Sequence, residues 1–180
     1  MKENVTVDPG FAKIMLGITL WDTLWEAGAD LQVAPGCPNL IERIEAGLLS
    51  YGNEMTRENN PLEINLDRFC HLEREIDYIG RSALEAIAAQ GPSQRMRGLL
   101  IDGTPCPPCG KPWPVLVGDI KVGQVTSAIW SPAFRQNVGL SLIDKDHWNP
   151  GTPVTVLLPD GHELGAVITS LPFTVSSSTP

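Results

Sequence analysis

The sequence predicts an α+β protein in which a helix-containing region, residues 1–93, precedes a small antiparallel β-barrel, residues 94–175. Apolar residues keep helical spacing up to about Arg95 and alternate with polar residues after it. Turn signals then separate many short strand candidates, which favours a closed barrel because an open sheet would leave its edges exposed. Residues 176–180 form a short polar tail that we expect to be disordered.

The first predicted helix covers residues 18–27 and ends at Gly28. Asp8-Pro9-Gly10 is a turn signal, so it should interrupt any earlier element. Trp21 and Trp25 lie one helical turn apart, and tryptophans at this spacing belong to a core more often than to a cofactor site. We therefore expect both indoles to pack in the core.

A second, short amphipathic helix is predicted around residues 38–47. Pro38 suits its first turn, where a missing N–H costs nothing, and Gly47 suits a left-handed C-terminal cap. Arg43 and Glu45 flank its apolar face, from which charged side chains can reach water or a cleft. Four apolar residues at helical spacing form that face: Leu40, Ile41, Ile44 and Leu48.

A loop at residues 59–63 and an extended stretch at 66–72 lead to a third predicted helix at 83–90. Ser82 and Glu85 have capping-box spacing at its start, and Gly91-Pro92 stops it. The sequence further predicts six strands, at residues 96–101, 114–118, 120–130, 137–143, 153–158 and 163–171. Gly118-Asp119 and Asp160-Gly161 have the turn chemistry of tight hairpins.

Composition excludes several classes of function. The chain has 180 residues, 42% of them hydrophobic, and a formal net charge of −8. Because phosphate binding relies on clustered Lys and Arg, a broad nucleic-acid or anionic-membrane surface is not expected. The first fifteen residues lack the pattern of a signal peptide, and no run of eighteen apolar residues occurs. We expect a soluble, cytoplasmic protein.

The four cysteines, Cys37, Cys70, Cys106 and Cys109, are too few and too irregularly spaced for a disulfide framework, so we expect free thiols. Cys106 and Cys109 have C-x-x-C spacing, which could serve redox exchange or supply half of a zinc site. Prolines between and before them oppose a thioredoxin-like helix start, and a second close ligand pair is lacking. No bound zinc and no persistent disulfide are expected.

Two motifs resemble a known family. Residues 43–48, Arg-Ile-Glu-Ala-Gly-Leu, followed by 51–54, Tyr-Gly-Asn-Glu, resemble the folate-dependent T-protein family, which includes the aminomethyltransferase of glycine cleavage and its demethylase relatives. The lead-in at residues 35–42 is most similar to the dimethylsulfoniopropionate demethylase branch. Residues 123–137, Gly-Gln-Val-Thr-Ser-Ala-Ile-Trp-Ser-Pro onward, resemble a strand of the family's barrel.

The resemblance implies that residues 1–93 are part of the folate-binding domain and that 94–175 are the C-terminal barrel. Tetrahydrofolate is the cofactor that the resemblance implies; its amide-like pterin edge suits carboxylates and its anionic tail suits Arg. Four residues are the implied binding groups, namely Arg43, Tyr51, Glu45 and Asn53. The family's catalytic Asp and its Gly-Glu-x-Gly-aromatic-Glu strand are not found here, so no catalytic residue is assigned.

The implied reaction is methyl transfer from a small sulfonium donor to tetrahydrofolate. An aminomethyl transfer of the glycine-cleavage type is the alternative, as is a noncatalytic folate-binding or interaction module of the same fold. A redox or zinc module on Cys106 and Cys109 is a third reading. The expected partners are the one-carbon donor and either the family's N-terminal half or a second copy of the chain, bound through residues 1–60.

Overall fold

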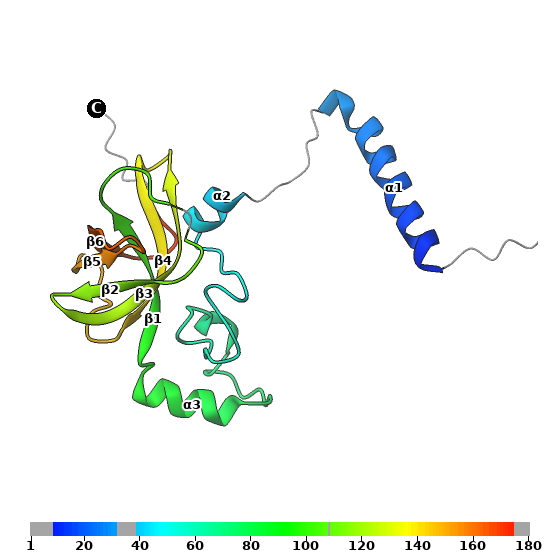
Figure 1. Cartoon of the computed structure of the whole chain (residues 1–180). Helices are drawn as coiled ribbons and strands as arrows, with labels where there is room; N and C mark the ends of the chain where they lie inside the picture. The colour runs from blue at the N-terminus through cyan, green and yellow to red at the C-terminus, as the bar shows by residue number, and fades with distance from the viewer. Residues whose placement is uncertain (1–8, 32–38, 108, 175–180) are drawn as a thin grey trace, which may run out of the picture. The chain divides into compact units, whose positions relative to one another are not determined.

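The computed structural model describes residues 9–31, 39–107 and 109–174, with side chains from residue 17 onward (Figure 1). It separates into two compact units, Met1–Cys37 and Pro38–Pro180, which are treated individually below. The second unit holds residues 38–93 together with the barrel. The predicted boundary near residue 93, between part of a folate-binding domain and the barrel domain, stays a prediction.

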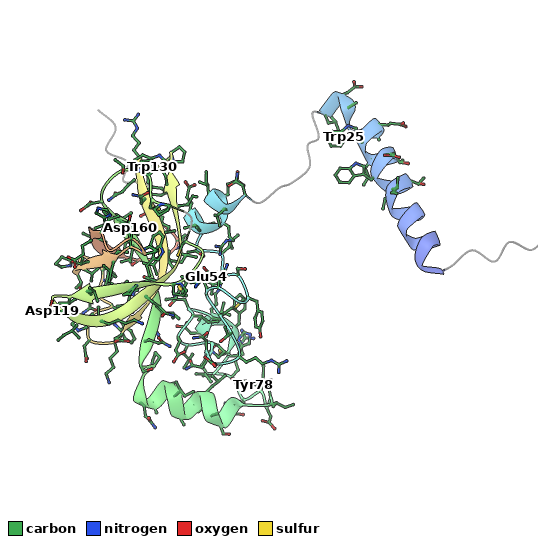
Figure 2. All side chains as sticks on the ribbon, viewed as in Figure 1. Trp25, Glu54, Tyr78, Asp119, Trp130 and Asp160 are labelled. Carbon is green, nitrogen blue, oxygen red and sulfur yellow. The ribbon has the colours of Figure 1, made fainter. Side chains whose placement is uncertain are left out.

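Helix α1, Pro9–Ala27, is longer than predicted and is followed by a short 3-10 turn, η1, at Ala29–Leu31. Pro9 begins the helix instead of interrupting it, because its fixed φ and missing N–H suit a first helical turn. The expectation that Trp21 and Trp25 pack in a core is wrong. Their rings stack with centroids 5.8 Å apart, and the two residues stay 54% and 46% exposed. Trp25 is labelled in Figure 2.

The apolar surface of α1 predicts concentration-dependent self-association through residues 1–60, because large exposed apolar patches are rare on monomers. Replacing Trp21 and Trp25 together by serine should weaken the association by removing the stacked pair. Asp22→Ser in the same helix is the control, since it leaves the apolar surface intact. Light scattering over a concentration series measures the effect, and a monomer at every concentration would contradict the prediction.

Helix α2, Leu40–Glu45, starts with Asn39, whose side-chain oxygen accepts the Glu42 N–H at 2.9 Å. It ends in a Schellman cap in which Gly47, at φ +67°, donates to the Ile44 carbonyl, confirming the predicted left-handed glycine. The predicted apolar face is only partly correct. Ile44 is fully buried, whereas Leu40 and Leu48 are exposed, because six residues bring a single turn against the barrel.

The stretch predicted to be extended at 66–72 instead contains a 3-10 turn, η2, at Asp67–Phe69, closed by local i+3 hydrogen bonds. Helix α3, Arg81–Gln90, begins two residues earlier than the capping-box spacing suggests. Gly80 is its N-cap, so Ser82 does not cap it, and Glu85 pairs with Arg81 at 2.7 Å. Gly91, at φ +76°, ends the helix as predicted.

Six antiparallel strands then close into a barrel, as predicted, and their order around it is β1-β4-β3-β2-β5-β6 (Figure 1). Each observed strand overlaps its prediction and differs from it only at the ends. The glycine-containing turns join β2 to β3 and β5 to β6. The strands are β1 Gln94–Ile101, β2 Trp113–Val117, β3 Ile120–Ser131, β4 Gln136–Asp144, β5 Pro153–Leu157 and β6 Glu163–Thr169.

Two apolar clusters hold this unit together. The barrel interior contains alternate residues of all six strands, such as Leu99, Val115 and Val156. The opposite face of β1 and β4 presents Met96, Val138 and Leu140 to Ile44 of α2. This second cluster docks the segment after α2 onto the outside of the barrel. Within the described residues, the structure has no helix with the length and apolar character needed to cross a membrane.

Candidate functional site

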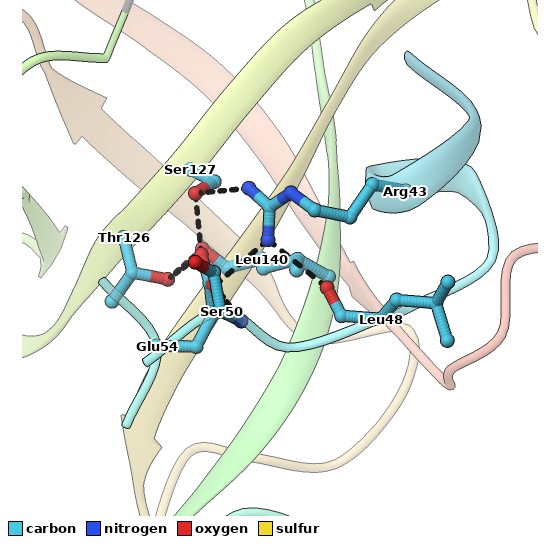
Figure 3. Close-up of polar contacts among 7 residues, drawn as sticks. All are labelled: Arg43, Leu48, Ser50, Glu54, Thr126, Ser127 and Leu140. Carbon is cyan, nitrogen blue, oxygen red and sulfur yellow. Dashed lines mark hydrogen bonds and ion pairs between the residues drawn. The ribbon is translucent and has the colours of Figure 1, made fainter. Parts of the chain in front are cut away.

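A buried carboxylate, Glu54, lies where the segment after α2 meets the barrel (Figure 2). Its side chain is inaccessible to solvent and accepts four hydrogen bonds. Oε2 accepts Arg43 Nη1 at 2.8 Å and the Ser50 N–H at 2.7 Å, while Oε1 accepts the hydroxyls of Ser127 and Thr126 (Figure 3). Hydrogen bonds to both carboxylate oxygens offset the free-energy cost of burying the charge.

Arg43 joins three parts of the fold. Its Nη1 donates to the Leu48 carbonyl at 3.0 Å and to Glu54, and its Nη2 donates to Ser127 Oγ at 2.8 Å. The Ser127 hydroxyl donates its own hydrogen bond to Glu54, so the three side chains form a closed ring (Figure 3). Three of the five guanidinium N–H groups are thereby used. The side chain is 17% exposed.

The network depends on an irregularity in β3. Successive side chains of a regular strand point to opposite faces, so Thr126 and Ser127 should not reach the same group. The pairing of β3 with β4 shifts register between Val125 and Ser127, which is a β-bulge at Thr126. Both hydroxyls consequently reach Glu54, and Thr126 Oγ1 also lies 3.1 Å from the Leu140 carbonyl.

Glu45 contacts the barrel at the C-terminal end of β3. Its Oε1 accepts the Ser131 hydroxyl, and Ser131 Oγ in turn accepts the Phe134 N–H at 3.1 Å. The Glu45 carbonyl accepts the Phe173 N–H at 3.3 Å. Arg43 and Glu45 therefore both fasten α2 to β3 and to the turns around it.

Tyr51 and Asn53 lie on an exposed turn. Glu54, which belongs to the hydrogen-bond network of Arg43, Thr126 and Ser127, holds this turn through the Ser50 N–H. The Asn53 and Glu54 N–H groups both donate to the Ser50 carbonyl, and the Ser50 N–H is held by Glu54. The Tyr51 ring is 68% exposed, and within the described part of the chain its hydroxyl has no hydrogen-bond partner. The four predicted binding residues are thus divided, with Arg43 and Glu45 facing the barrel and Tyr51 and Asn53 facing outward.

Sequence reasoning did not single out Glu54, Thr126 or Ser127. All three lie inside the two motifs described above, at residues 51–54 and 123–137. For Thr126 and Ser127 the signal was the placement of short polar residues in a strand otherwise rich in Val, Ile and Ala. That signal does not identify partners, because Ser127 is 73 positions from Glu54 in the sequence.

An open pocket of about 380 Å³ adjoins the C-terminal turn of α2. Backbone and side chains of residues 46–49 form one wall, and Met55, Leu66 and Met96 contribute apolar surface. Arg68 supplies a cation at this pocket, and its guanidinium lies 4.7 Å above the Phe69 ring. The pocket lies beside the motif at residues 43–54 and offers space for part of a small molecule.

The C-x-x-C thiols belong to the rim of the barrel core. Burial raises the pKa of Cys109 to about 11 and also raises the pKa of Cys106, so both thiols are weakly nucleophilic at neutral pH. Both are free in the structure. Among the described residues no group of three or more His, Cys, Asp or Glu is arranged to hold a metal ion. Absence of zinc and of a persistent disulfide stays a prediction.

Two family models match the chain. The glycine cleavage T-protein C-terminal barrel domain matches residues 94–174, and the GCVT N-terminal domain matches residues 12–74. The dimethylsulfoniopropionate demethylase DmdA of Ruegeria pomeroyi is 53% identical over 146 residues, which cover 81% of this chain and 39% of that protein. An aminomethyltransferase of Symbiobacterium thermophilum is 36% identical over 157 residues, covering 86% of this chain and 41% of the relative.

A solved structure agrees with these matches. The crystal structure of aminomethyltransferase T of the glycine cleavage system from Bartonella henselae superposes with a TM-score of 0.67 at 25% sequence identity. The superposition covers 75% of this chain and 37% of that one. The chain thus spans about two fifths of the length of the relatives it matches.

Proposed function

Because the chain belongs to the glycine cleavage T-protein family, we propose that it is part of a tetrahydrofolate-dependent methyltransferase that demethylates dimethylsulfoniopropionate. Residues 1–93 would contribute to the folate-binding domain and 94–175 would form the barrel that supports it. One observation carries the choice of substrate: identity to DmdA is 53%, against 36% to the aminomethyltransferase of Symbiobacterium thermophilum.

The exposed turn and the nearby pocket fit part of a folate. The Tyr51 phenol and the Asn53 carboxamide can each both donate and accept, as the amide-like edge of a pterin requires. Two N–H groups of Arg43 make no hydrogen bond within the described residues and could donate to the ligand. Arg68 lines the pocket, where its guanidinium could pair with the anionic tail of folate. Glu45 and Glu54 are both engaged with barrel hydroxyls, so their part is to hold the turn.

Tetrahydrofolate would supply the nitrogen that accepts the methyl group. The bond between this methyl carbon and the positive sulfur breaks, the sulfonium leaves as a neutral sulfide, and the N–H proton of the accepting nitrogen is released. The protein performs little covalent chemistry in such a transfer, so orienting the reactants supplies most of the acceleration. In this proposal the ring of Arg43, Ser127 and Glu54 keeps the turn rigid, and Tyr51 and Asn53 contact the folate. A buried and fully hydrogen-bonded network is suited to such positioning.

A chimaera tests the activity. In Ruegeria pomeroyi DmdA, the stretch matched over 146 residues is replaced by the corresponding residues of this chain. We expect the chimaera to convert dimethylsulfoniopropionate and tetrahydrofolate to the demethylated sulfide and methyl-tetrahydrofolate, measured by mass spectrometry. A second chimaera carrying the Symbiobacterium thermophilum stretch is the control and should lose this activity. This chain alone is assayed in parallel.

Three outcomes distinguish the alternatives. Methyl transfer by the first chimaera alone supports the proposal. Ammonia release from an aminomethyl-lipoyl donor, without methyl transfer, would favour the aminomethyltransferase reading. A folded chimaera that binds folate but transfers neither group would favour a noncatalytic module.

A further inference from the structure

Two Asp-Gly pairs lie in the barrel region, Asp102-Gly103 directly after β1 and Asp160-Gly161 in the turn between β5 and β6. Such a pair is open to rearrangement of its main chain, because glycine has no Cβ to hinder the approach of its nitrogen to the aspartyl side chain. The pairs have the same sequence and all four residues are exposed. Their surroundings in the fold therefore decide which of them reacts.

The fold holds Asp160-Gly161 against this rearrangement. The Gly161 N–H donates to the Leu158 carbonyl at 3.0 Å, so the nitrogen is engaged within the turn. Asp160 Oδ1 accepts the His162 N–H at 3.1 Å, and Oδ2 lies 3.0 Å from His162 Nδ1. The hydrogen bond from the His162 side chain lowers the pKa of Asp160, which keeps the carboxylate ionised. An ionised carboxylate held at both oxygens is a poor target for the glycine nitrogen.

Asp102-Gly103 lacks these restraints. Within the described part of the chain, the Gly103 N–H donates no hydrogen bond. The Asp102 carboxylate has a single side-chain contact there, from Gln136 Nε2 to Oδ1 at 3.4 Å, which is long for a hydrogen bond. Residues 102–105 are four consecutive exposed positions, so solvent reaches this stretch. Both reacting groups are thus less restrained at Asp102 than at Asp160.

We propose that Asp102-Gly103 is a site of spontaneous aspartate isomerisation, in which the Gly103 nitrogen bonds to Asp102 Cγ and closes a cyclic succinimide. The N–H proton leaves with the carboxyl O–H as water. Water then adds back to the ring: opening at the main-chain carbonyl of Asp102 gives isoaspartate, and opening at Cγ restores aspartate. No oxidant takes part and the mass is unchanged. The inference does not depend on the proposed transferase activity.

The rearrangement lengthens the main chain between two fixed points. The Asp102 N–H donates to the Gly165 carbonyl at 2.8 Å. The buried side chain of Asn137 donates to the Thr104 carbonyl at 2.9 Å and accepts the Cys106 N–H at 2.8 Å. Because isoaspartate continues the chain through its Cβ and Cγ, it inserts an extra atom between these anchors. The isomerised chain should therefore melt at a lower temperature than the parent chain.

The whole chain is incubated for several weeks in mildly acidic buffer and digested with trypsin. Electron-transfer fragmentation in a mass spectrometer then distinguishes isoaspartate from aspartate of equal mass. Lys121 and Lys145 lie between the two pairs, so trypsin places them in different peptides. We expect isoaspartate to accumulate about three- to tenfold faster at Asp102 than at Asp160, the factor expected when the second pair must first break a hydrogen bond.

His162→Ala tests the reason for the difference. It removes the side-chain contact with Asp160 on an exposed turn, so isoaspartate at Asp160 should form about two- to fivefold faster while Asp102 is unchanged. His147→Ala, at a histidine outside both pairs, is the matched control and should change neither. Asp102→Glu should abolish isomerisation at residue 102, because its longer side chain would have to close a larger ring. Aged parent chain should show a lower-melting fraction that aged Asp102→Glu lacks.

The proposal is overturned if Asp160 isomerises as fast as Asp102, or if Asp102 isomerises no faster than Asp119, which no glycine follows. It is also overturned if His162→Ala and His147→Ala isomerise alike at Asp160. An aged parent chain that contains isoaspartate at residue 102 and melts like Asp102→Glu would contradict the strain assigned to the lengthened chain. None of these results bears on methyl transfer by the chimaera, so failure here and failure of the proposed function are distinguishable.

Discussion

Replacing Glu54 with alanine is expected to lower the free energy of unfolding by about 3–5 kcal/mol, as for a buried ion pair that loses one partner. The variant leaves Arg43 without its counter-ion and removes the acceptor of Ser50, Thr126 and Ser127 at once. Urea denaturation, followed by circular dichroism, measures the loss. Glu58→Ala is the matched control, because Glu58 is an exposed acid in the same segment, and it should change stability little.

A double-mutant cycle separates the pair from its surroundings. Arg43→Met and Glu54→Leu should each destabilise, because each leaves the other charge in a mostly buried site. The combined variant should lose less than the sum of the two, by about 1 kcal/mol or more, since no isolated charge then remains. Simple additivity would mean that Arg43 and Glu54 are not energetically coupled, and the role assigned to the network would be incorrect.

Arg43→Lys in the demethylase chimaera is expected to weaken folate binding by about 1–3 kcal/mol, the range for losing hydrogen bonds of a charged group. A lysine ammonium can still reach Glu54, but it cannot replace the planar fork that also bonds Leu48 and Ser127. Folate affinity is measured by calorimetry alongside the melting temperature. Arg57→Lys, at an exposed arginine of the same segment, is the control.

Tyr51→Ala distinguishes a loss of folate contacts from a loss of protein stability. The Tyr51 ring is largely exposed, so its removal should leave the melting temperature of the chimaera nearly unchanged while folate binding weakens. If Arg43→Lys lowers only the melting temperature, Arg43 acts purely as a structural ion pair. If Tyr51→Ala also leaves binding unaltered, the folate site does not lie at this turn.

The strands could be predicted almost completely, because their signals are local. Alternation of apolar residues places β1 to β6, and the glycine turns at Gly118 and Gly161 join two of the hairpins. The cap of α2 could also be predicted from local sequence, since glycine adopts the φ of +67° at residue 47 more readily than residues that carry a Cβ. The capping of α3 was mistaken because Ser82-x-x-Glu85 spacing competes there with Gly80 and with the Arg81–Glu85 pair.

Burial was harder to predict than element type. Helical spacing places Leu40, Ile44 and Leu48 on one face, yet only Ile44 is covered. The spacing of apolar residues predicts which side chains lie on the same face of a helix. Whether they are buried depends on how much of that face a neighbouring element contacts. Helix α2 has six residues, and its docking onto β3 and β4 conceals one turn. Trp21 and Trp25 illustrate the same limit, since each covers part of the other and neither is buried.

By itself, the sequence determined the α+β class, the antiparallel barrel, the cap of α2 and the resemblance to the T-protein family, because periodicity, turn chemistry and motif spacing act over a few residues. Only the tertiary structure decided what Arg43 and Glu54 do. Their partner Ser127 is 84 and 73 positions away, and it reaches them through a bulge at Thr126. Such contacts form when α2 docks onto the barrel, and no local pattern encodes the distance between two side chains that far apart in the chain.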